Sequence, residues 1–391
     1  MSLLSNEPTY PLLHSILQLV LEQNQQLERA MSQVFAAQRP SMTLQSQVVR
    51  DCGLVLRKLN AYQQVAGPDA SLNQLLSTFF QLQHASQSPE QQSQLRQKWQ
   101  QLPSAVQDGC PAWLDQLGAS ELGAIWPSER AALAEPAPRF IRVNTLKTDR
   151  LTLQHALLKV GIHSEAVASI PTALRIKSDG ALFQTQAFQQ GWFEQQDAGS
   201  QMISAALAVQ PGSRVIDACA GAGGKTLSLS ALMQARGRLL AMDVEQWKLD
   251  NLQQRAKRAG AVNIETRLIS SSKTIKRLAG KADFLLLDVP CTGSGVLRRN
   301  PDAKWRSPMR LAELQKLQQD ILQRYSKMLT VGGQLVYATC SIFPSENRRQ
   351  IDSFLACRPD FVLVDDHSIS PAETGFDGFY YAHLRRISEC S

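Results

Sequence analysis

The chain has 391 residues, of which 43% are hydrophobic and 19% charged, with a formal net charge of +7 and a pI near 9.1. This is the composition of a globular protein of two or three domains, and its basic balance is compatible with a polyanionic partner. The start lacks a signal sequence, and no apolar run approaches the roughly 20 residues that span a bilayer, so no membrane association is expected. The seven scattered cysteines form no CxxC pair, which argues against a metal site or disulfides and favours a reduced, cytoplasmic setting.

Residues 1–135 are predicted to form a helical N-terminal domain. Leu12, Ile16, Leu19 and Val20 recur at helical spacing, and prolines interrupt the pattern. The glutamine-rich stretch 81–101 predicts an exposed helix or a linker. This region by itself suggests no chemistry.

Pro136-Ala-Pro138 marks a boundary. It is followed by an alternating strand at 139–147, a helix at 151–160 and an aromatic-containing strand and loop at 181–196. We therefore predict that residues 136–205 form a small α+β subdomain.

From residue 206 to 391, apolar strands alternate with amphipathic helices. Strands are predicted at 215–217, 238–243, 282–288 and 333–339, and helices at 226–235, 246–259, 310–329 and 346–357. This alternation predicts an α/β, Rossmann-like domain, with a largely parallel sheet covered by helices on both faces.

The loop Asp217-Ala-Cys-Ala-Gly-Ala-Gly-Gly-Lys-Thr226 follows the first of these strands. Its glycines allow tight turns beside a ligand at the start of a helix, and Asp243, which ends the next strand, suits ribose hydroxyls. Three cofactors compete for this loop. A Walker loop requires glycine where Cys219 stands, and a dinucleotide site requires a different glycine spacing. An adenosyl cofactor is the remaining option.

Two cysteines follow predicted strands in turns of small residues, Cys291 in Asp288-Val-Pro-Cys-Thr-Gly-Ser-Gly295 and Cys340 in Tyr337-Ala-Thr-Cys-Ser341. Free cysteines are commonly core residues, but Cys291 and Cys340 follow strands in turns at the edge of the predicted sheet, and this placement favours a functional role for both. A thiolate that adds to C6 of a pyrimidine makes C5 nucleophilic enough to accept a methyl group. Asp288 is placed to bind the exocyclic amine or N3 edge of cytosine, and Gly293 and Gly295 are expected to leave room for a flat base.

A basic segment follows Cys291 directly. Arg298, Arg299, Lys304 and Arg306 are expected to hold RNA phosphates, and Trp305 either stacks on a base or packs against the core. Arg142, with Arg139 and Lys147, is a weaker candidate for the same role, since the alternative is a solvated strand edge.

With these motifs, the chain resembles the RsmB/Sun family of RNA cytosine-5 methyltransferases over roughly residues 110–387. The resemblance rests on several segments that occur in the same order: Pro111-Ala-Trp-Leu114, Glu135-Pro-Ala-Pro138, Ile141-Arg-Val-Asn-Thr145, Gln196-Asp197, Ser200-Gln201, the glycine loop, Asp288-Val-Pro-Cys291, Thr339-Cys-Ser341 and Asp377-Gly-Phe-Tyr-Tyr-Ala382.

The resemblance implies that Cys340 attacks C6 and that Cys291 assists release of the methylated product. It implies S-adenosylmethionine as the cofactor, with Asp288 between cofactor and base and an RNA-binding role for residues 136–205. The residues that it assigns to the cofactor are Cys219, Ala220, Gly221, Ala222, Gly223, Gly224, Lys225, Asp243, Ser270 and Asp288.

The chain departs from the family pattern at three places. The usual Cys-Ala-Ala-Pro-Gly-Gly-Lys loop here lacks its proline, and Ser270 stands where the family has an aspartate that contacts adenine. The first 110 residues do not match the family's helical RNA-binding domain, although an RNA-targeting role remains possible for residues 1–135.

We therefore expect a cytoplasmic, monomeric, S-adenosylmethionine-dependent RNA cytosine C5 methyltransferase acting on ribosomal RNA. One alternative is the same chemistry on transfer RNA. A second is a non-catalytic RNA-binding factor of ribosome assembly, which would need neither thiol. A third, a P-loop ATPase, is disfavoured by Cys219.

Overall fold

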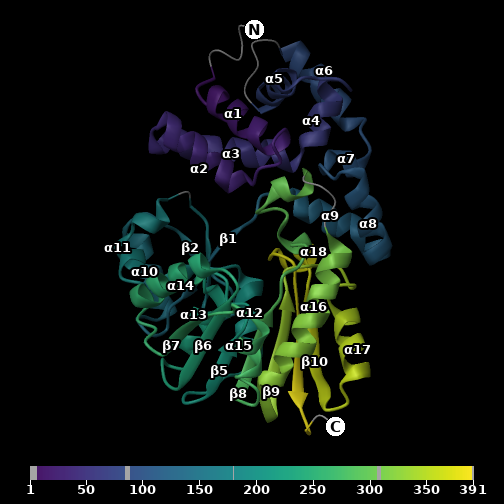
Figure 1. Ribbon diagram of the computed structural model, residues 1–391. Coiled ribbons are helices and arrows are strands. Elements are labelled where there is room, and N and C mark those ends of the chain that lie inside the picture. Colours follow the sequence, from purple (N-terminus) through teal and green to yellow (C-terminus); the bar gives the residue numbers. More distant parts are fainter. Residues whose placement is uncertain (1–6, 84–88, 179, 306–309, 390–391) are drawn as a thin grey trace. The chain divides into compact units, whose positions relative to one another are not determined.

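The computed structural model describes residues 7–83, 89–178, 180–305 and 310–389 (Figure 1). The chain divides into two compact units, residues 1–137 with 296–309, and residues 138–295 with 310–391. In the described part of the chain, no helix is both long and apolar enough to cross a membrane.

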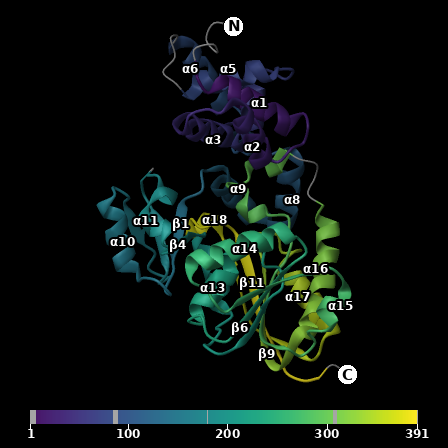
Figure 2. The same ribbon diagram turned by 60° about the vertical axis from the view of Figure 1, so that its left-hand side comes forward.

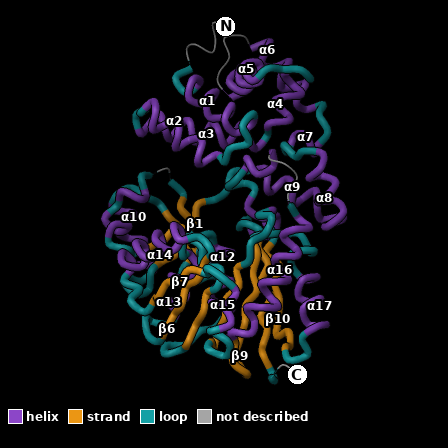
Figure 3. Tube along the Cα trace, viewed as in Figure 1, coloured by secondary structure: helices purple, strands orange, loops and turns teal. Residues whose placement is uncertain are grey.

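The first unit is helical throughout its N-terminal part (Figure 3). Leucine, isoleucine and phenylalanine side chains at helical spacing, among them Leu13, Ile16, Leu56 and Phe79, form its buried core. Its helices are α1 (Tyr10–Leu21), α2 (Leu27–Gln38), α3 (Met42–Arg57), α4 (Leu59–Ala66), α5 (Leu72–Gln83), α6 (Pro89–Gln100), α7 (Ser104–Gln107), α8 (Ala112–Leu122), η2 (Gly123–Ile125) and α9 (Trp126–Ala134).

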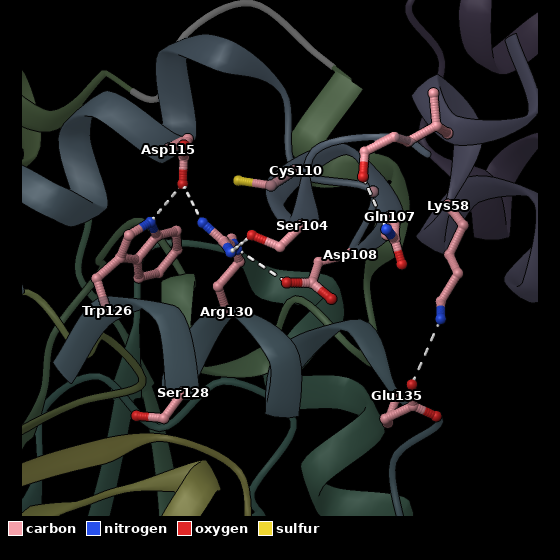
Figure 4. Close-up of polar contacts among 12 residues, drawn as sticks. Lys58, Ser104, Gln107, Asp108, Cys110, Asp115, Trp126, Ser128, Arg130 and Glu135 are labelled. Carbon is pink, nitrogen blue, oxygen red and sulfur yellow. Dashed lines mark hydrogen bonds and ion pairs between the residues drawn. The ribbon is translucent and has the colours of Figure 1, made fainter. Parts of the chain in front are cut away.

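Arg130 ties the last helices of this unit together (Figure 4). From α9 its guanidinium donates to Asp108 at 2.9 Å, to Asp115 on α8 at 2.7 Å and to Ser104 on α7 at 3.0 Å. The Trp126 indole N–H donates to the same Asp115 oxygen at 2.7 Å. A planar group with several fixed donors suits a junction of this kind, so this cluster is structural.

Residues 296–309 leave the second unit and complete the first. Their 3-10 helix η5 (Pro301–Trp305) contacts α3. The Lys304 ammonium donates to the carbonyls of Arg57 and Gly109, both at 2.8 Å, and the Trp305 indole donates to the Leu56 carbonyl at 2.6 Å. This segment is therefore part of the helical unit, although it lies within the range 206–391 that the sequence assigns to the α/β domain.

The second unit contains two sheets. The smaller one has the order β2-β3-β1-β4, with each neighbouring pair antiparallel. Ile141 and Phe193 from this sheet pack with Leu153 and Ala187 from two helices around a core of their own. The elements are β1 (Arg139–Val143), α10 (Arg150–Lys159), β2 (Ser164–Ala166), β3 (Ala173–Ile176), η3 (Leu182–Gln184), α11 (Gln186–Gln189) and β4 (Phe193–Gln195).

The larger sheet has the order β10-β11-β9-β8-β5-β6-β7. Strands β5 to β9 are mutually parallel, and β11 runs antiparallel to both of its neighbours. The strands are β5 (Arg214–Asp217), β6 (Arg238–Asp243), β7 (Ile264–Leu268), β8 (Ala282–Asp288), β9 (Leu329–Thr339), β10 (Phe361–Ile369) and β11 (Phe379–Arg386).

Helices cover both faces of this sheet (Figures 1 and 2). The strand order reverses at β5, so right-handed crossovers place the helices that follow β5 and β8 on opposite faces. Buried apolar strands such as 285–287 form the main core, as expected for a sheet covered on both sides. The helices are α12 (Ala198–Ala206), α13 (Gly224–Leu232), α14 (Gln246–Ala259), α15 (Ser272–Lys276), η4 (Ser294–Val296), α16 (Leu311–Tyr325), η6 (Ser326–Met328), α17 (Arg348–Cys357) and α18 (Pro371–Thr374). This architecture confirms the Rossmann-like α/β fold.

Candidate active site at the carboxyl ends of the central strands

Four neighbouring parallel strands end at one edge of the large sheet. Asp217 ends β5, Asp243 ends β6, Asp288 ends β8, and Cys340 directly follows β9. Strand order reverses around β5, and such a switch point is where open α/β sheets bind ligands. The topology therefore brings together the acids, the glycine loop and the cysteines that the sequence singles out.

The two cysteine thiols are in direct contact. The Sγ atoms of Cys291 and Cys340 are 3.3 Å apart, within the range of a hydrogen bond between sulfurs. The hydrogen bond with Cys340, together with burial, raises the pKa of Cys291 well above its ordinary value. Cys291 therefore keeps its proton at neutral pH and can donate it in a hydrogen bond to the Cys340 sulfur.

A network of polar side chains fixes the Cys291 loop. Glu346 accepts hydrogen bonds from the Thr292 N–H at 2.9 Å and the Thr292 hydroxyl at 2.5 Å. Gln318 on α16 donates to Glu346 and to the Pro290 carbonyl, both at 2.9 Å. Glu346 and Gln318 are fully buried, so they act as rigid supports. Sequence reasoning missed both, because a glutamate in the turn before α17 and a glutamine on the amphipathic helix α16 carry no local signal.

The Cys340 loop is attached to the Cys291 loop by short hydrogen bonds. The hydroxyls of Ser294 and Ser341 are 2.9 Å apart, and the Gly295 N–H donates to the Cys340 carbonyl at 3.0 Å. Asn347 adds a further support, accepting from Thr339 at 2.6 Å and donating to the Ser341 carbonyl at 2.9 Å. The sulfur–sulfur distance is therefore set by the backbone of both loops.

Gly295 has a different role from the one expected. Its N–H and carbonyl bond the two neighbouring loops, and a Cβ there would lie 2.1 Å from the Gly378 carbonyl oxygen. The missing side chain thus allows close approach of the segment at Gly378, which corrects the interpretation that Gly295 leaves room for a base.

Asp288 is held by the lysine of the glycine loop. The Lys225 Nζ lies 2.6 Å from an Asp288 carboxylate oxygen and 5.7 Å from the centre of the Phe379 ring. Burial by itself lowers the pKa of Lys225, but the adjacent Asp288 carboxylate outweighs it and the net pKa is raised. Lys225 is therefore charged at neutral pH and orients Asp288 at the edge of the site.

Side chains of the second unit hold the glycine loop in place. Arg142 on β1 donates to the Gly224 carbonyl at 2.8 Å and to Gln196 at 2.6 Å. Arg255 on α14 donates to the Ala222 carbonyl at 2.6 Å and pairs with Glu194 on β4 at 2.9 Å. Two arginines thus anchor loop carbonyls, and the small sheet supports the loop directly. Arg255 and Glu194 were missed because their pairing joins distant parts of the sequence.

The loop and its neighbours fit an adenosyl cofactor. Cys219, Ala220 and Ala222 lie between Asp217 and α13, and a Cβ added at Gly221 or Gly224 would meet no heavy atom within 4 Å. Asp243 accepts the N–H groups of Gly221 at 2.9 Å and Glu245 at 3.0 Å, and each of its oxygens retains a lone pair for a ribose hydroxyl.

Asp217 and Ser270 complete the surroundings of the loop. Burial raises the pKa of Asp217 to about 7, and one of its carboxylate oxygens has no hydrogen-bond partner among the described residues. Ser270 is exposed two residues beyond the end of β7, next to the strand that ends at Asp243. Its position is consistent with the adenine side of the site.

The structure corrects part of the expected RNA-binding set. Arg298 and Lys304 are 3 and 4% exposed within the helical unit, and Arg142 is 3% exposed beneath the glycine loop, where burial lowers its pKa to about 10. Side chains buried in this way are not available to phosphates. Arg299 is half-buried and stays a candidate, and Arg306 lies outside the described residues.

Comparison with known proteins gives the family. Residues 204–385 match the model of the 16S rRNA methyltransferase RsmB/F family, and residues 110–182 match that of the RsmF/B-like ferredoxin-like domain. The ribosomal RNA small subunit methyltransferase B of Sodalis glossinidius is 34% identical over 314 residues, which are 74% of this chain and 70% of that protein. The chain belongs to the RsmB/Sun methyltransferase family. This membership confirms S-adenosylmethionine as the cofactor that the glycine loop predicts.

Other members of the family and solved structures agree with this assignment. The probable ribosomal RNA small subunit methyltransferase B of Synechocystis is 33% identical over 71% of this chain, and the match spans 66% of its own length, or about two thirds. A methyltransferase homologue from Pyrococcus horikoshii is 28% identical with a TM-score of 0.64, covering 73% of this chain and 98% of that one. The crystal structure titled PH0851 shares the fold over 97% of this chain and 99% of its own, with a TM-score of 0.80 at 23% identity.

Proposed function

We propose that this protein methylates C5 of a cytosine in small-subunit ribosomal RNA through a covalent adduct between Cys340 and C6 of the base. The observation that carries the proposal is the contact of the two thiols, 3.3 Å apart, at the ligand-binding edge of an S-adenosylmethionine-type sheet. A protein that only binds RNA would need neither thiol, still less a buried network that fixes both.

The geometry supports different roles for the two cysteines. The Cys340 thiolate bonds to C6, and the electrons of the 5,6 double bond move to C5, which becomes nucleophilic. When bound, S-adenosylmethionine supplies an electrophilic methyl group on its sulfonium. After the C5 proton passes to a base, the double bond re-forms and the bond between Cys340 and C6 breaks. Cys291, which keeps its proton, stabilises the departing Cys340 thiolate by donating a hydrogen bond.

We assign recognition of the cytosine ring to Asp288 and Lys225. Asp288 accepts a hydrogen bond from the exocyclic amine of cytosine, a donor that uracil lacks, and this contact selects the base. Lys225, 2.6 Å away, pairs with Asp288 and orients its carboxylate.

The RNA substrate is inferred from the family. The relatives above are named as methyltransferases of the small ribosomal subunit RNA. C6 cannot be reached inside a stacked helix, so the target cytosine must be unpaired or flipped out of the stack. The small sheet of residues 139–195 is the remaining candidate for contacts close to the base.

The first test uses Cys291→Ala with S-adenosylmethionine and small-subunit ribosomal RNA from cells that lack the enzyme. Without the Cys291 hydrogen bond the adduct should persist, giving a protein–RNA band that survives denaturing electrophoresis. The matched control is Cys291→Ala/Cys340→Ala, which should give no band. Sequencing the trapped RNA would identify the cytosine.

Three outcomes would contradict the proposal. A band that persists in the double variant would place the attacking group elsewhere. No band, together with unchanged methyl transfer by Cys340→Ala, would exclude the covalent mechanism. A band with transfer RNA alone would move the substrate to the other RNA class.

A further inference from the structure

A cavity lies against the large sheet. It has a volume of about 330 Å³ and is bordered by the amino-terminal ends of β5 and β6, by β7, and by the segment that follows α15. Along β6, its wall begins at Arg238, roughly 17 Å from Asp243 at 3.3 Å per residue, and on β7 it reaches Arg267, which pairs with Met242 beside Asp243. None of the residues that border it belongs to the active site described above.

Five cations border this cavity: Arg214, Arg238, Arg267, Arg277 and Lys281. Two of them are neutralised. Arg214 pairs with Asp283 through contacts of 2.5 and 3.1 Å, and Arg238 pairs with Glu265 through contacts of 2.8 and 2.9 Å.

The other three cations make no direct ion pair with a described residue. In the described part of the chain, no acid lies within ion-pairing distance of Arg267, Arg277 or Lys281, so the rim keeps a net charge of +3. The surrounding segment 267–281 contains five lysines and arginines and no acid. Like charges gathered in this way repel one another, and an anion bound between them would relieve that repulsion.

The floor of the cavity is apolar. Val215, Ile216, Leu240 and Leu278 border it, each at most 9% exposed. Arginine forks above an apolar floor match a nucleotide unit, whose phosphate takes charged donors while its sugar and base cover apolar surface.

We propose that this cavity binds a phosphate-bearing nucleotide of the RNA substrate, at a position remote from the target cytosine. The inference rests on the proposed function, which supplies the RNA. Because the starts of β5 and β6 border the cavity and the catalytic residues follow their carboxyl ends, an RNA that occupies both must extend from one end of these strands to the other. The cavity would therefore favour a long, folded RNA over a short fragment that carries the same cytosine.

The test compares Arg267→Gln/Arg277→Gln/Lys281→Gln with Lys257→Gln/Lys316→Gln/Arg385→Gln in the full-length protein. The control removes the same charge from exposed positions that do not border the cavity. Binding of transcribed small-subunit ribosomal RNA, and of its shortest fragment that still binds, is measured across a salt series. We expect the cavity variant to lose about tenfold in affinity for the long RNA, with a salt slope smaller by about 1 or more, and to bind the fragment like wild type.

Several results would overturn this inference. The cavity is not an RNA site if the two variants bind the long RNA equally. An equal loss of affinity for fragment and long RNA would place the contact beside the target base. Saturable binding of free adenosine monophosphate to wild type but not to the cavity variant, with RNA binding unchanged, would make it a small-molecule site.

Because these readouts need no methyl transfer, they separate this inference from the proposed reaction. Cofactor binding by calorimetry should be unchanged in both variants, which shows that each is folded. A wild type that binds RNA but transfers no methyl group would contradict the proposed function alone.

Discussion

Two basic segments of this chain differ in how far their cations are exposed to solvent. The segment 297–306 carries four cations and a tryptophan next to Cys291, whereas 267–281 carries five cations on and around α15. In the first segment, Arg298 and Lys304 are buried in the helical unit and Trp305 packs against its core. In the second, Lys273, Lys276, Arg277 and Lys281 are exposed.

The difference teaches that local charge does not determine whether a cation meets solvent. Lys304 can be buried because two backbone carbonyls, those of Arg57 and Gly109, accept its protons at 2.8 Å. Burial still lowers the pKa of Lys304 to about 8. Segment 297–306, which the sequence suggests as an RNA contact, instead packs into the helical unit. The cavity cations without a direct ion pair lie in segment 267–281.

The largest effect is expected for Trp305→Ala. It removes an indole from the core of the helical unit and leaves the Leu56 carbonyl without its 2.6 Å donor. We expect a loss of about 3 kcal/mol of stability, seen as faster amide hydrogen exchange in α3. The methyltransferase unit is the internal control, since exchange in β8 should not change. Unaltered protection of α3, with weakened RNA binding, would return Trp305 to a stacking role.

A smaller loss is expected for Lys304→Met, which has a similar length but no donors. Two buried carbonyls lose charge-assisted hydrogen bonds, while the cost of burying an ammonium disappears, leaving a net loss of about 2 kcal/mol. Chemical unfolding should show it, and the salt slope of RNA binding should stay at the wild-type value. A slope reduced by about 1 would show that Lys304 contacts a phosphate after all.

The same lysine predicts a pH dependence. Its pKa is about 8 in the folded chain, below the ordinary 10.5, so the unfolded chain binds more protons between about pH 8 and 10.5. Stability contributed by Lys304 therefore rises with pH in this window, by about 1 kcal/mol between pH 8 and 9. The difference in unfolding free energy between wild type and Lys304→Met measures it. A difference that stays flat or falls would mean that the ammonium is not desolvated.

The smallest effect on stability is expected in the other segment. Lys273→Ala/Lys276→Ala should change the unfolding free energy by less than about 0.5 kcal/mol, because both side chains are exposed. Affinity for long RNA should nevertheless fall a few-fold, through the loss of nearby positive charge. Destabilisation similar to that of Trp305→Ala would show that segment 267–281, like segment 297–306, is packed into the fold.

Strands and helices with strong apolar patterns were predictable from the sequence. The strand 282–288 and the helix 246–259 are observed with the predicted bounds, and the strand at 139 and the helix at 151 shift only at their ends. The strands β7, β10 and β11 were missed. Of these, β7 and β10 lie at the edges of the sheet and carry charged residues, so their patterns lack the continuous apolar run of a central strand.

The site was predictable where one loop carries the signal. The glycine loop, Asp243, Asp288 and both cysteines meet at one edge because parallel strands place their carboxyl ends together. The supports did not follow from sequence, since Glu346 reaches Thr292 across 54 positions and Arg142 reaches Gly224 across 82. The tertiary fold determines which of many polar residues supports the catalytic loops, and the spacing of residues along the chain does not predict it.

The route of the chain through residues 296–309 affects how the protein can be made. On the ribosome, helices α1 to α9 emerge long before the tryptophan that covers part of their core, because strands β1 to β8 are synthesised in between. The helical unit therefore cannot finish folding until most of the catalytic sheet has been translated. A fragment that ends at residue 137 would leave the Trp305 contact surface on α3 exposed, and a fragment that starts at 138 would carry Trp305 without the helices against which it packs.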